Sequence, residues 1–196
     1  MSKKYIYIPV NSEEMQEFAK DLAAAWKIPV NQILANKATS GCGKAMYRWV
    51  DKCLSKLTAA DTLYIVTHGT GAADGKVIGA ERSVGSNKQK KVVERGTVSW
   101  EGGEWKTYTP EQLATTLTKE GLPVNFVDLH VCACGSGYDG KKLRPWAQRL
   151  QQQMVGTYSS IKVTGYLGWF SCSTNKVCIK VGHEFFPMEE RAVTFS

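Results

Sequence analysis

Two apolar runs constrain the fold of this chain more than any other feature. Residues 62–67 (TLYIVT) and 124–131 (VNFVDLHV) contain a single carboxylate between them and several β-branched side chains. Strands as apolar as these are typical of parallel sheets that are covered on both faces. The sequence therefore predicts a parallel sheet with helices on each side. A length of 196 residues fits one domain, which we place at residues 1–196.

Strand and helix patterns alternate around these runs. Residues 4–9 (KYIYIP) are expected to form an opening or edge strand that ends at Pro9. Asn11 and Glu14 have the spacing of a capping box, and apolar residues follow at helical intervals up to Pro29. This part of the chain is therefore predicted to run from a strand into a helix.

The segment at residues 108–123 (YTPEQLATTLTKEGLP) has the clearest helix boundaries. Thr109 can act as the N-cap, Pro110 suits the first helical position, and Gln112 completes a capping box. Gly121 suits the C-terminal end of the helix. A helix is therefore predicted between Thr109 and Gly121.

Other segments complete the predicted pattern. Helical spacing predicts helices over residues 44–57 and from Pro145 onward, and the tail at 161–170 and 177–186 is expected to form a β-hairpin. Residues 74–107 are predicted to be a surface excursion with short strand-like pieces. The fold class is therefore α/β, a three-layer α/β/α sandwich built on a mostly parallel sheet.

Both apolar runs end in a reactive side chain that is followed by glycine. The first continues into His68-Gly69 and the second into Cys132, with Gly135 three residues later. Since the carboxyl ends of parallel strands meet at one edge of a sheet, His68 and Cys132 are expected to lie side by side. A thiolate is a nucleophile, and an imidazole can accept and return its proton. The sequence thus predicts a Cys/His dyad.

Three segments carry a family resemblance over about residues 60–137: an apolar strand ending in His-Gly, the helix Thr-Pro-Glu-Gln-Leu-Ala-x-x-Leu with a closing Gly-Leu-Pro, and an apolar strand ending in x-x-Cys-x-x-Gly. They resemble the caspase-like cysteine peptidases, a superfamily that includes separases, gingipains, clostripain and the self-cleaving domains of bacterial toxins. The bacterial toxin and effector branch is the nearest. The resemblance implies a caspase-like sheet with a C-terminal β-hairpin and a cysteine endopeptidase that acts on proteins or peptides.

The resemblance also implies roles for individual residues. His68 becomes the general base and acid, Cys132 the nucleophile, and the backbone amides of Gly69 and Cys132 the oxyanion hole. Cys134 is the alternative nucleophile, because Ala133-Cys134-Gly135 also matches the Ala-Cys-x tripeptide of the family. We prefer Cys132, since it directly follows the apolar run.

Substrate preference does not transfer, because the caspase pentapeptide around the nucleophile is missing. Tyr166 and Trp169, in the segment GYLGW, are candidates for lining a substrate pocket, although aromatic residues there are more often ordinary packing. His130, Cys132, Cys134 and His183 are candidate zinc ligands, but structural zinc ligands usually lie on tight knuckles rather than at the end of a buried strand. No metal is therefore expected.

The chain has 25 basic and 18 acidic residues, a net charge of +7. Basic residues cluster at Lys88, Lys90, Lys91 and Arg95, at Lys141, Lys142 and Arg144, and more sparsely at Lys162, Lys176 and Lys180. A nucleic-acid-binding domain driven by this charge is a third alternative, which is not favoured because no RNA-binding, helix-turn-helix or zinc-finger pattern accompanies the charge. The resemblance implies instead that a polyanion such as inositol hexakisphosphate could act as an activator, with no other cofactor required.

The sequence also bears on compartment. No run reaches the ~18 apolar residues of a membrane helix, and no signal core follows the start MSKKYIYIPV. The six cysteines lack zinc-type spacing, so reduced thiols are the default. We expect a cytoplasmic bacterial protein without a membrane span, or one delivered to a host cell independently of a signal peptide. The alternative function is a catalytically inactive caspase-like module that binds a protein or a polyanion.

Overall fold

The computed structural model describes residues 2–35, 51–69, 75–84, 86–94, 97–173 and 176–196. A six-stranded sheet forms the centre of the fold. Its strands, in the order in which they lie side by side, are β13 (Ala192–Phe195), β9 (Lys162–Tyr166), β8 (Asp128–Cys132), β3 (Thr62–Val66), β1 (Lys4–Ile8) and β2 (Ile33–Ala35). All neighbours are parallel except β13, which runs antiparallel to β9. The predicted mostly parallel sheet is confirmed.

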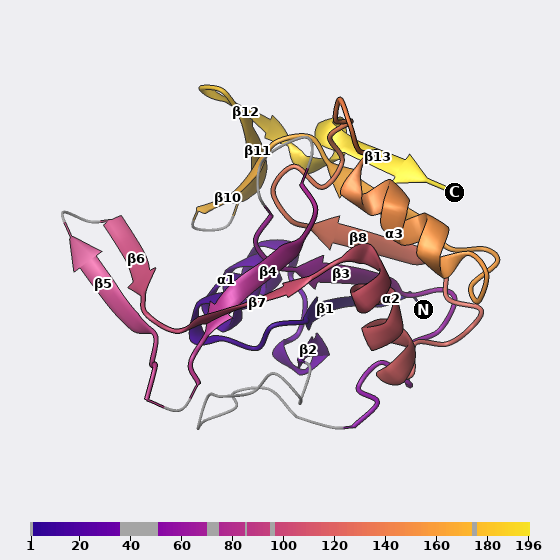
Figure 1. The fold of residues 1–196 in the computed structure, drawn as a ribbon, viewed down its shortest axis with the longest axis horizontal. Coiled ribbons are helices and arrows are strands. Elements are labelled where there is room, and N and C mark those ends of the chain that lie inside the picture. Colours follow the sequence, from indigo (N-terminus) through magenta and orange to yellow (C-terminus); the bar gives the residue numbers. More distant parts are fainter. Residues whose placement is uncertain (1, 36–50, 70–74, 85, 95–96, 174–175) are drawn as a thin grey trace.

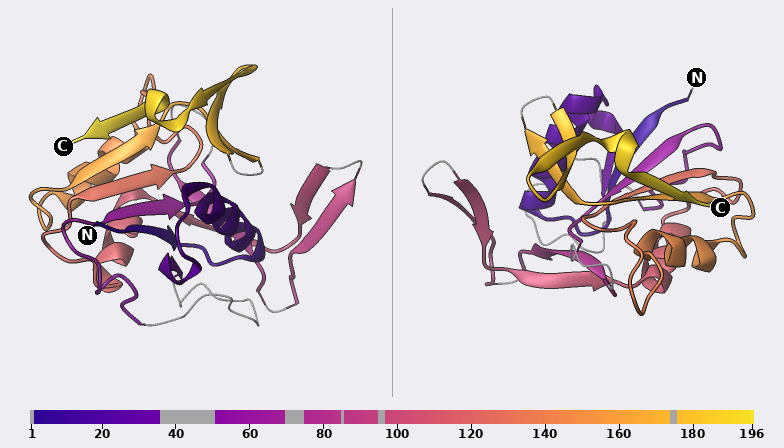
Figure 2. Two further views of the ribbon diagram at one scale, coloured as in Figure 1. Left: turned by 180° about the vertical axis from the view of Figure 1, so that it is seen from behind. Right: turned by 90° about the horizontal axis from the view of Figure 1, so that it is seen from above.

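Helices cover both faces of this sheet (Figures 1 and 2). The helices α2 (Pro110–Lys119) and α3 (Trp146–Met154) pack on one face, and α1 (Glu13–Trp26) packs on the other. On the α1 side, the rings of Trp26 and Tyr64 lie 4.6 Å apart between centroids. The predicted three-layer α/β/α architecture is confirmed.

The ends of α2 follow from its sequence. The side chain of Thr109 accepts a hydrogen bond from the backbone N–H of Gln112, and the backbone N–H of Thr109 donates to the Gln112 side chain. Gly121 adopts φ of +82°, a left-handed conformation that glycine tolerates best. The predicted capping box and glycine stop are both confirmed.

The start of α1 differs from the prediction. Its N-cap is Ser12, whose hydroxyl accepts a hydrogen bond from the Met15 backbone at 3.2 Å. Asn11, predicted to be the cap, instead accepts a bond from the Gln16 side chain at 2.7 Å. Glu14 is therefore not part of a capping box, and its carboxylate is directed elsewhere.

Two further expectations at the β2 edge need correction. The strand β1 is internal to the sheet, because the unpredicted strand β2 pairs with its outer side. The predicted helix over residues 44–57 falls partly outside the described residues. Its described part is residues 51–57, of which 51–56 form turns that bury Leu54.

Among its described residues, the excursion contains four strands, in line with the short strand-like pieces expected there. The described residues elsewhere also include a small C-terminal sheet and the 3₁₀ turns η1 and η3. These elements are β4 (Ile78–Arg82), β5 (Lys90–Glu94), β6 (Thr97–Glu101), β7 (Glu104–Tyr108), β10 (Trp169–Ser173), β11 (Lys176–Val181), β12 (Glu184–Pro187), η1 (Val30–Gln32) and η3 (Met188–Arg191). The pairs β4–β7 and β5–β6 are antiparallel, and β5–β6 extends away from the body of the molecule (Figure 1).

The C-terminal region is more elaborate than a single hairpin. The strands β10, β11 and β12 form a three-stranded antiparallel sheet of their own, whereas β9 and β13 belong to the central sheet. In the described part of the chain, no helix has the length and apolarity needed to cross a bilayer.

Candidate active site

The site lies where the order of the central strands changes direction. From β1 the chain continues to β2 on one side, whereas β3, β8 and β9 follow one another on the other side. Crevices for ligands form at such switch points, outside the carboxyl ends of the strands. A cavity of about 490 Å³ lies there, between α1 and the segments that follow β3 and β8. Its lining residues are Glu14, Met15, Glu17, Phe18, Asp21, Thr67, His68, Lys91, Cys134 and Phe170.

Gly69 joins the two segments that carry the reactive side chains. A Cβ atom at position 69 would lie 2.7 Å from the backbone nitrogen of Cys134 and 2.9 Å from its carbonyl carbon. Only glycine permits so close an approach. The backbone of His68 exchanges two hydrogen bonds with Gly79 in β4, at 2.9 and 3.0 Å. These contacts fix His68 beside the turn that begins at Cys134, and both residues line the same cavity.

The structure does not bring the preferred thiol, Cys132, to this cavity. Cys132 is the last residue of β8, lies in register with Val66, and has no exposed surface. Since strand residues two apart face the same side, Cys132 points to the same covered side of the sheet as His130. Burial raises the pKa of the Cys132 thiol, which disfavours a thiolate. Of the two cysteines considered, Cys134 is the one that lies with His68.

The environment of Cys134 contains opposing influences. Partial burial raises the pKa of its thiol, while the backbone N–H groups of Phe170, Gly69 and Cys134 itself lower it. Amides that favour a thiolate can also stabilise an oxyanion that forms next to the sulfur. The resemblance implies an oxyanion hole formed by the amides of Gly69 and Cys132. In the structure, the amides of Gly69 and Cys134 lie beside the half-buried sulfur of Cys134 instead.

The turn that carries Cys134 is held by a buried serine. The hydroxyl of Ser136 donates to the carbonyl oxygen of Val131 at 2.8 Å and accepts from the backbone N–H of Tyr166 at 3.0 Å. The backbone N–H of Gly135 donates to the carbonyl of Gly168 at 2.8 Å. The turn is thereby tied both to β8 and to the chain that connects β9 with β10.

Glu14 is the functional candidate that the sequence did not identify. Its Oε1 lies 3.0 Å from Nε2 of His68, and the two side chains are 24% and 40% exposed. A carboxylate at this distance orients an imidazole and stabilises its protonated form. The spacing to Asn11 suggested a capping role, and nothing in the local sequence indicates a partner in the segment after β3.

The two residues proposed to line a substrate pocket lie outside the cavity. Tyr166 is buried, and its hydroxyl oxygen lies 2.7 Å from Nδ1 of His130, whose Nε2 lies 3.1 Å from Asp128. Trp169 is exposed, but its neighbour Phe170 is the one that lines the cavity. Tyr166 therefore belongs to a packed cluster with His130, and Trp169 lies on the surface.

An exposed tryptophan that the sequence did not single out lies near the histidine. The ring of Trp105, in β7, is 62% exposed, and its centroid lies 6.2 Å from that of His68. It provides apolar surface next to His68, and no sequence motif marked it.

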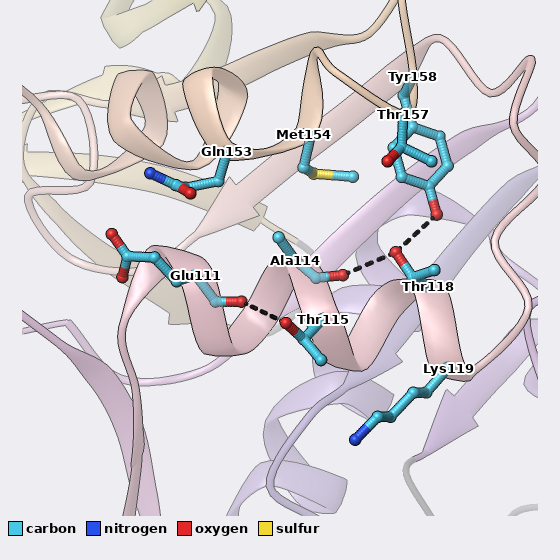
Figure 3. Close-up of a pocket in the computed structure, with 9 residues that line it drawn as sticks. All are labelled: Glu111, Ala114, Thr115, Thr118, Lys119, Gln153, Met154, Thr157 and Tyr158. Carbon is cyan, nitrogen blue, oxygen red and sulfur yellow. Dashed lines mark hydrogen bonds between the residues drawn. The ribbon is translucent and has the colours of Figure 1, made fainter.

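A second cavity, of about 390 Å³, lies between α2 and α3 (Figure 3). The hydroxyl of Thr118 donates to the carbonyl of Ala114 and lies 3.1 Å from the hydroxyl of Tyr158. The described residues that line it include neither cysteine nor histidine, so they offer no nucleophile and base pair.

The considered zinc ligands do not assemble. Over the described ranges, no three His, Cys, Asp or Glu side chains come together in a way that could hold a metal ion. His130 is engaged with Tyr166 and Asp128 instead.

Neither a scan of protein-family models nor a search of curated proteins returns a match for this chain.

Proposed function

We propose that the chain is a caspase-like cysteine endopeptidase of the bacterial effector or toxin type, with Cys134 as nucleophile and His68 as general base and acid. One observation carries the proposal. Gly69 lies directly against the backbone of Cys134, so that imidazole and thiol line one cavity at the carboxyl ends of β3 and β8. The family resemblance supports it in the register Ala133-Cys134-Gly135.

The proposed reaction has two halves. The sulfur of Cys134 attacks the carbonyl carbon of a peptide bond as its proton passes to His68, and an oxyanion forms. The C–N bond then breaks, and His68 protonates the departing amine, which leaves a thioester on Cys134. A water molecule gives its proton to His68 and attacks the thioester, and the returning proton restores the thiol as the carboxylic acid product departs.

Groups around the dyad have supporting roles in this scheme. The backbone N–H groups of Gly69 and Cys134 stabilise the oxyanion, an effect typically worth about 3 kcal/mol for one donor. Glu14 holds the imidazole of His68 in place and stabilises its positive charge after proton transfer. A cysteine nucleophile of this kind suits a reducing compartment, so we place the protein in a cytosol, its own or that of a host.

Hydrolysis of a diverse peptide library by purified variants tests the proposal. Mass spectrometry should find cleaved peptides with wild type and with Cys132→Ala, the matched control for loss of a thiol. Cleavage should be lost in Cys134→Ala and His68→Ala. Full activity in folded Cys134→Ala would contradict the proposal, as would loss of activity in Cys132→Ala alone.

A second candidate function is supported by a separate basic cavity. A cavity of about 360 Å³ beside β2 includes Lys3, Lys52 and Lys56 in its lining, none of which belongs to the basic clusters noted in the sequence. Three ammonium groups suit a polyanion, which would fit either an activator such as inositol hexakisphosphate or a catalytically inactive binding module.

Calorimetry with inositol hexakisphosphate at physiological salt separates these roles. Binding that weakens in Lys3→Ala/Lys56→Ala and raises peptidase activity identifies an activator. Binding by a protein that cleaves none of the library peptides identifies a binding module. If no heat change is measured, inositol hexakisphosphate is neither an activator nor the ligand of a binding module.

A further inference from the structure

The small C-terminal sheet has one face packed on the body of the molecule and one face turned to solvent. Its strands β10 and β11 contact α1 at the outside of the molecule (Figures 1 and 2). Phe170, Ile179 and Phe186 lie opposite one another in the three strands, and Ile179 has no exposed surface. Val177 and Val181 share this face and pack against the core. These side chains form the inner face of the small sheet.

The outer face carries an exposed row of three side chains. Trp169, Lys180 and Phe185 pair across β10, β11 and β12, and residues directly opposite in antiparallel strands lie on the same face. Trp169 is 54% exposed and Phe185 is 58% exposed. Lys180 is exposed as well, and its Nζ lies 5.7 Å from the centroid of the Phe185 ring. Two aromatic rings therefore flank a lysine on an open sheet surface.

The rest of the outer face is basic or neutral. Residues two apart in a strand share a face, so Lys176 and Cys178 accompany Lys180, and Lys176 is exposed. Opposite Cys178 lie Ser171 in β10 and Pro187 in β12. Among the described residues that these strands place on the outer face, none is acidic. The face is therefore suited to a ligand with negative charge.

The aromatic rings narrow the class of ligand. Exposed aromatic rings can stack on nucleic-acid bases, and stacking accepts any base because each has a π-face. Since neighbouring strands lie about 4.8 Å apart, the backbones that carry Trp169 and Phe185 are about 10 Å apart, with the strand of Lys180 between them. Bases on the two rings would thus place the connecting phosphates near the Lys180 ammonium group.

We infer that the outer face of β10, β11 and β12 binds single-stranded nucleic acid, with bases stacked on Trp169 and Phe185 and phosphates held by Lys180 and Lys176. The inference is independent of the proposed peptidase function, because the dyad cavity is lined by Phe170 on the inner face. An anionic membrane fits this face less well. Lys180 separates the two rings, and the turn between β11 and β12 presents glycine and histidine rather than apolar side chains that could insert.

Fluorescence anisotropy at physiological salt measures this binding with labelled oligothymidylate and oligouridylate of about 12 nucleotides. Wild type should bind at least one of these strands at least about tenfold more tightly than a duplex of equal length, because the bases of a duplex are already stacked on one another. Equal affinity for single strand and duplex would overturn the inference, as would absence of binding to both single strands. Binding to phosphatidylserine vesicles but to neither oligonucleotide would also overturn it.

Leucine variants test the rings. Trp169→Leu/Phe185→Leu keeps apolar side chains on an exposed surface but removes both flat rings, so the Kd for the single strand should rise about hundredfold. Trp105→Leu is the matched control, because it removes a ring of similar exposure outside the small sheet. Circular dichroism checks that the variants are folded. Wild-type affinity in the folded double variant would overturn the inference.

The salt dependence of binding tests the lysine. Each phosphate contact on a single strand contributes about 0.7 to the slope of log Kd against log salt concentration, so Lys180→Gln should reduce that slope by about 0.7. Lys119→Gln, which removes the charge of an exposed lysine in α2, should leave the slope unchanged. A slope that Lys180→Gln does not change would overturn the proposed mode of binding.

Discussion

The Nε2 atom of His68 lies 3.0 Å from Oε1 of Glu14, a residue 54 positions earlier in the chain. The topology explains this contact. Since β1 and β3 are parallel neighbours, the helix that follows β1 begins at the same edge at which β3 ends. The contact gives the proposed Cys/His dyad a third member.

Replacing Glu14 by glutamine should lower kcat about tenfold and leave KM nearly unchanged on a peptide with an uncharged residue before the bond. The variant removes the negative charge that stabilises protonated His68 but keeps the size of the side chain. Steady-state kinetics with Glu13→Gln as control checks this. An unchanged kcat would show that Glu14 does not act through His68.

Gly69→Ala should reduce kcat/KM at least about hundredfold and destabilise the fold by about 1–3 kcal/mol. The added methyl group has no space because the backbone of Cys134 occupies its position. Gly156→Ala is the control, because a Cβ there would meet nothing within 4 Å. Urea unfolding and kinetics should show the losses only at position 69. Wild-type behaviour of Gly69→Ala would contradict the close contact between the two segments.

Ser136→Ala should lower the free energy of unfolding by about 1–3 kcal/mol. The substitution leaves the carbonyl oxygen of Val131 and the N–H of Tyr166 without their hydrogen-bond partner in a buried place. It should also lower kcat, because this serine secures the turn that carries Cys134. Chemical unfolding measures the free energy of unfolding of Ser136→Ala, with Ser160→Ala, a substitution of an exposed serine, as the control. Equal stability of both variants would exclude the bridging role of Ser136.

The stability of the protein should depend on Asp128 at low pH. Hydrogen bonds from His130 and Thr62 hold the pKa of the Asp128 carboxyl below its usual value despite the opposing effect of burial. Its contribution is therefore complete above a pH of about 4 and is lost as the pH falls further. Asp128→Asn should be less stable than wild type at pH 7, and the difference should narrow toward pH 3. The exposed Asp139→Asn is the control, and a difference that stays constant with pH would contradict this role.

The parts of the fold that could be predicted from sequence are those specified locally. The composition of the apolar runs that form β3 and β8 is enough to predict that these strands are buried. The limits of α2 are also predictable, because its N-cap, its proline and its terminal glycine all lie within or next to the helix. The strand β2 has only three residues and no pattern of its own, so it was missed. It forms because β1 offers it an unpaired edge, which is a tertiary effect.

The two cysteines illustrate the limit of a local pattern. The apolar run favours Cys132, which directly follows it, yet that continuity is the reason for its burial. It completes β8 in register with Val66 and faces the covered side of the sheet. The side chain that reaches the cavity comes two residues later, after the strand has ended at Cys132.

Glu14 illustrates a different limit. A carboxylate in the first turn of a helix is favourable for the helix itself, so the sequence offered a sufficient local reason for its presence. Its contact with His68 depends on how β1 and β3 lie next to each other, which no spacing along the chain reveals.

Covalent modification by a peptide-type, thiol-directed inactivator identifies the nucleophile directly, when it is measured by mass spectrometry of wild type, Cys132→Ala, Cys134→Ala and His68→Ala. If Cys134 is the nucleophile and His68 its base, wild type and Cys132→Ala carry a single adduct on Cys134, Cys134→Ala carries none, and His68→Ala is labelled much more slowly. An adduct on Cys132, or labelling spread over several cysteines at a rate that His68→Ala leaves unchanged, would contradict this assignment.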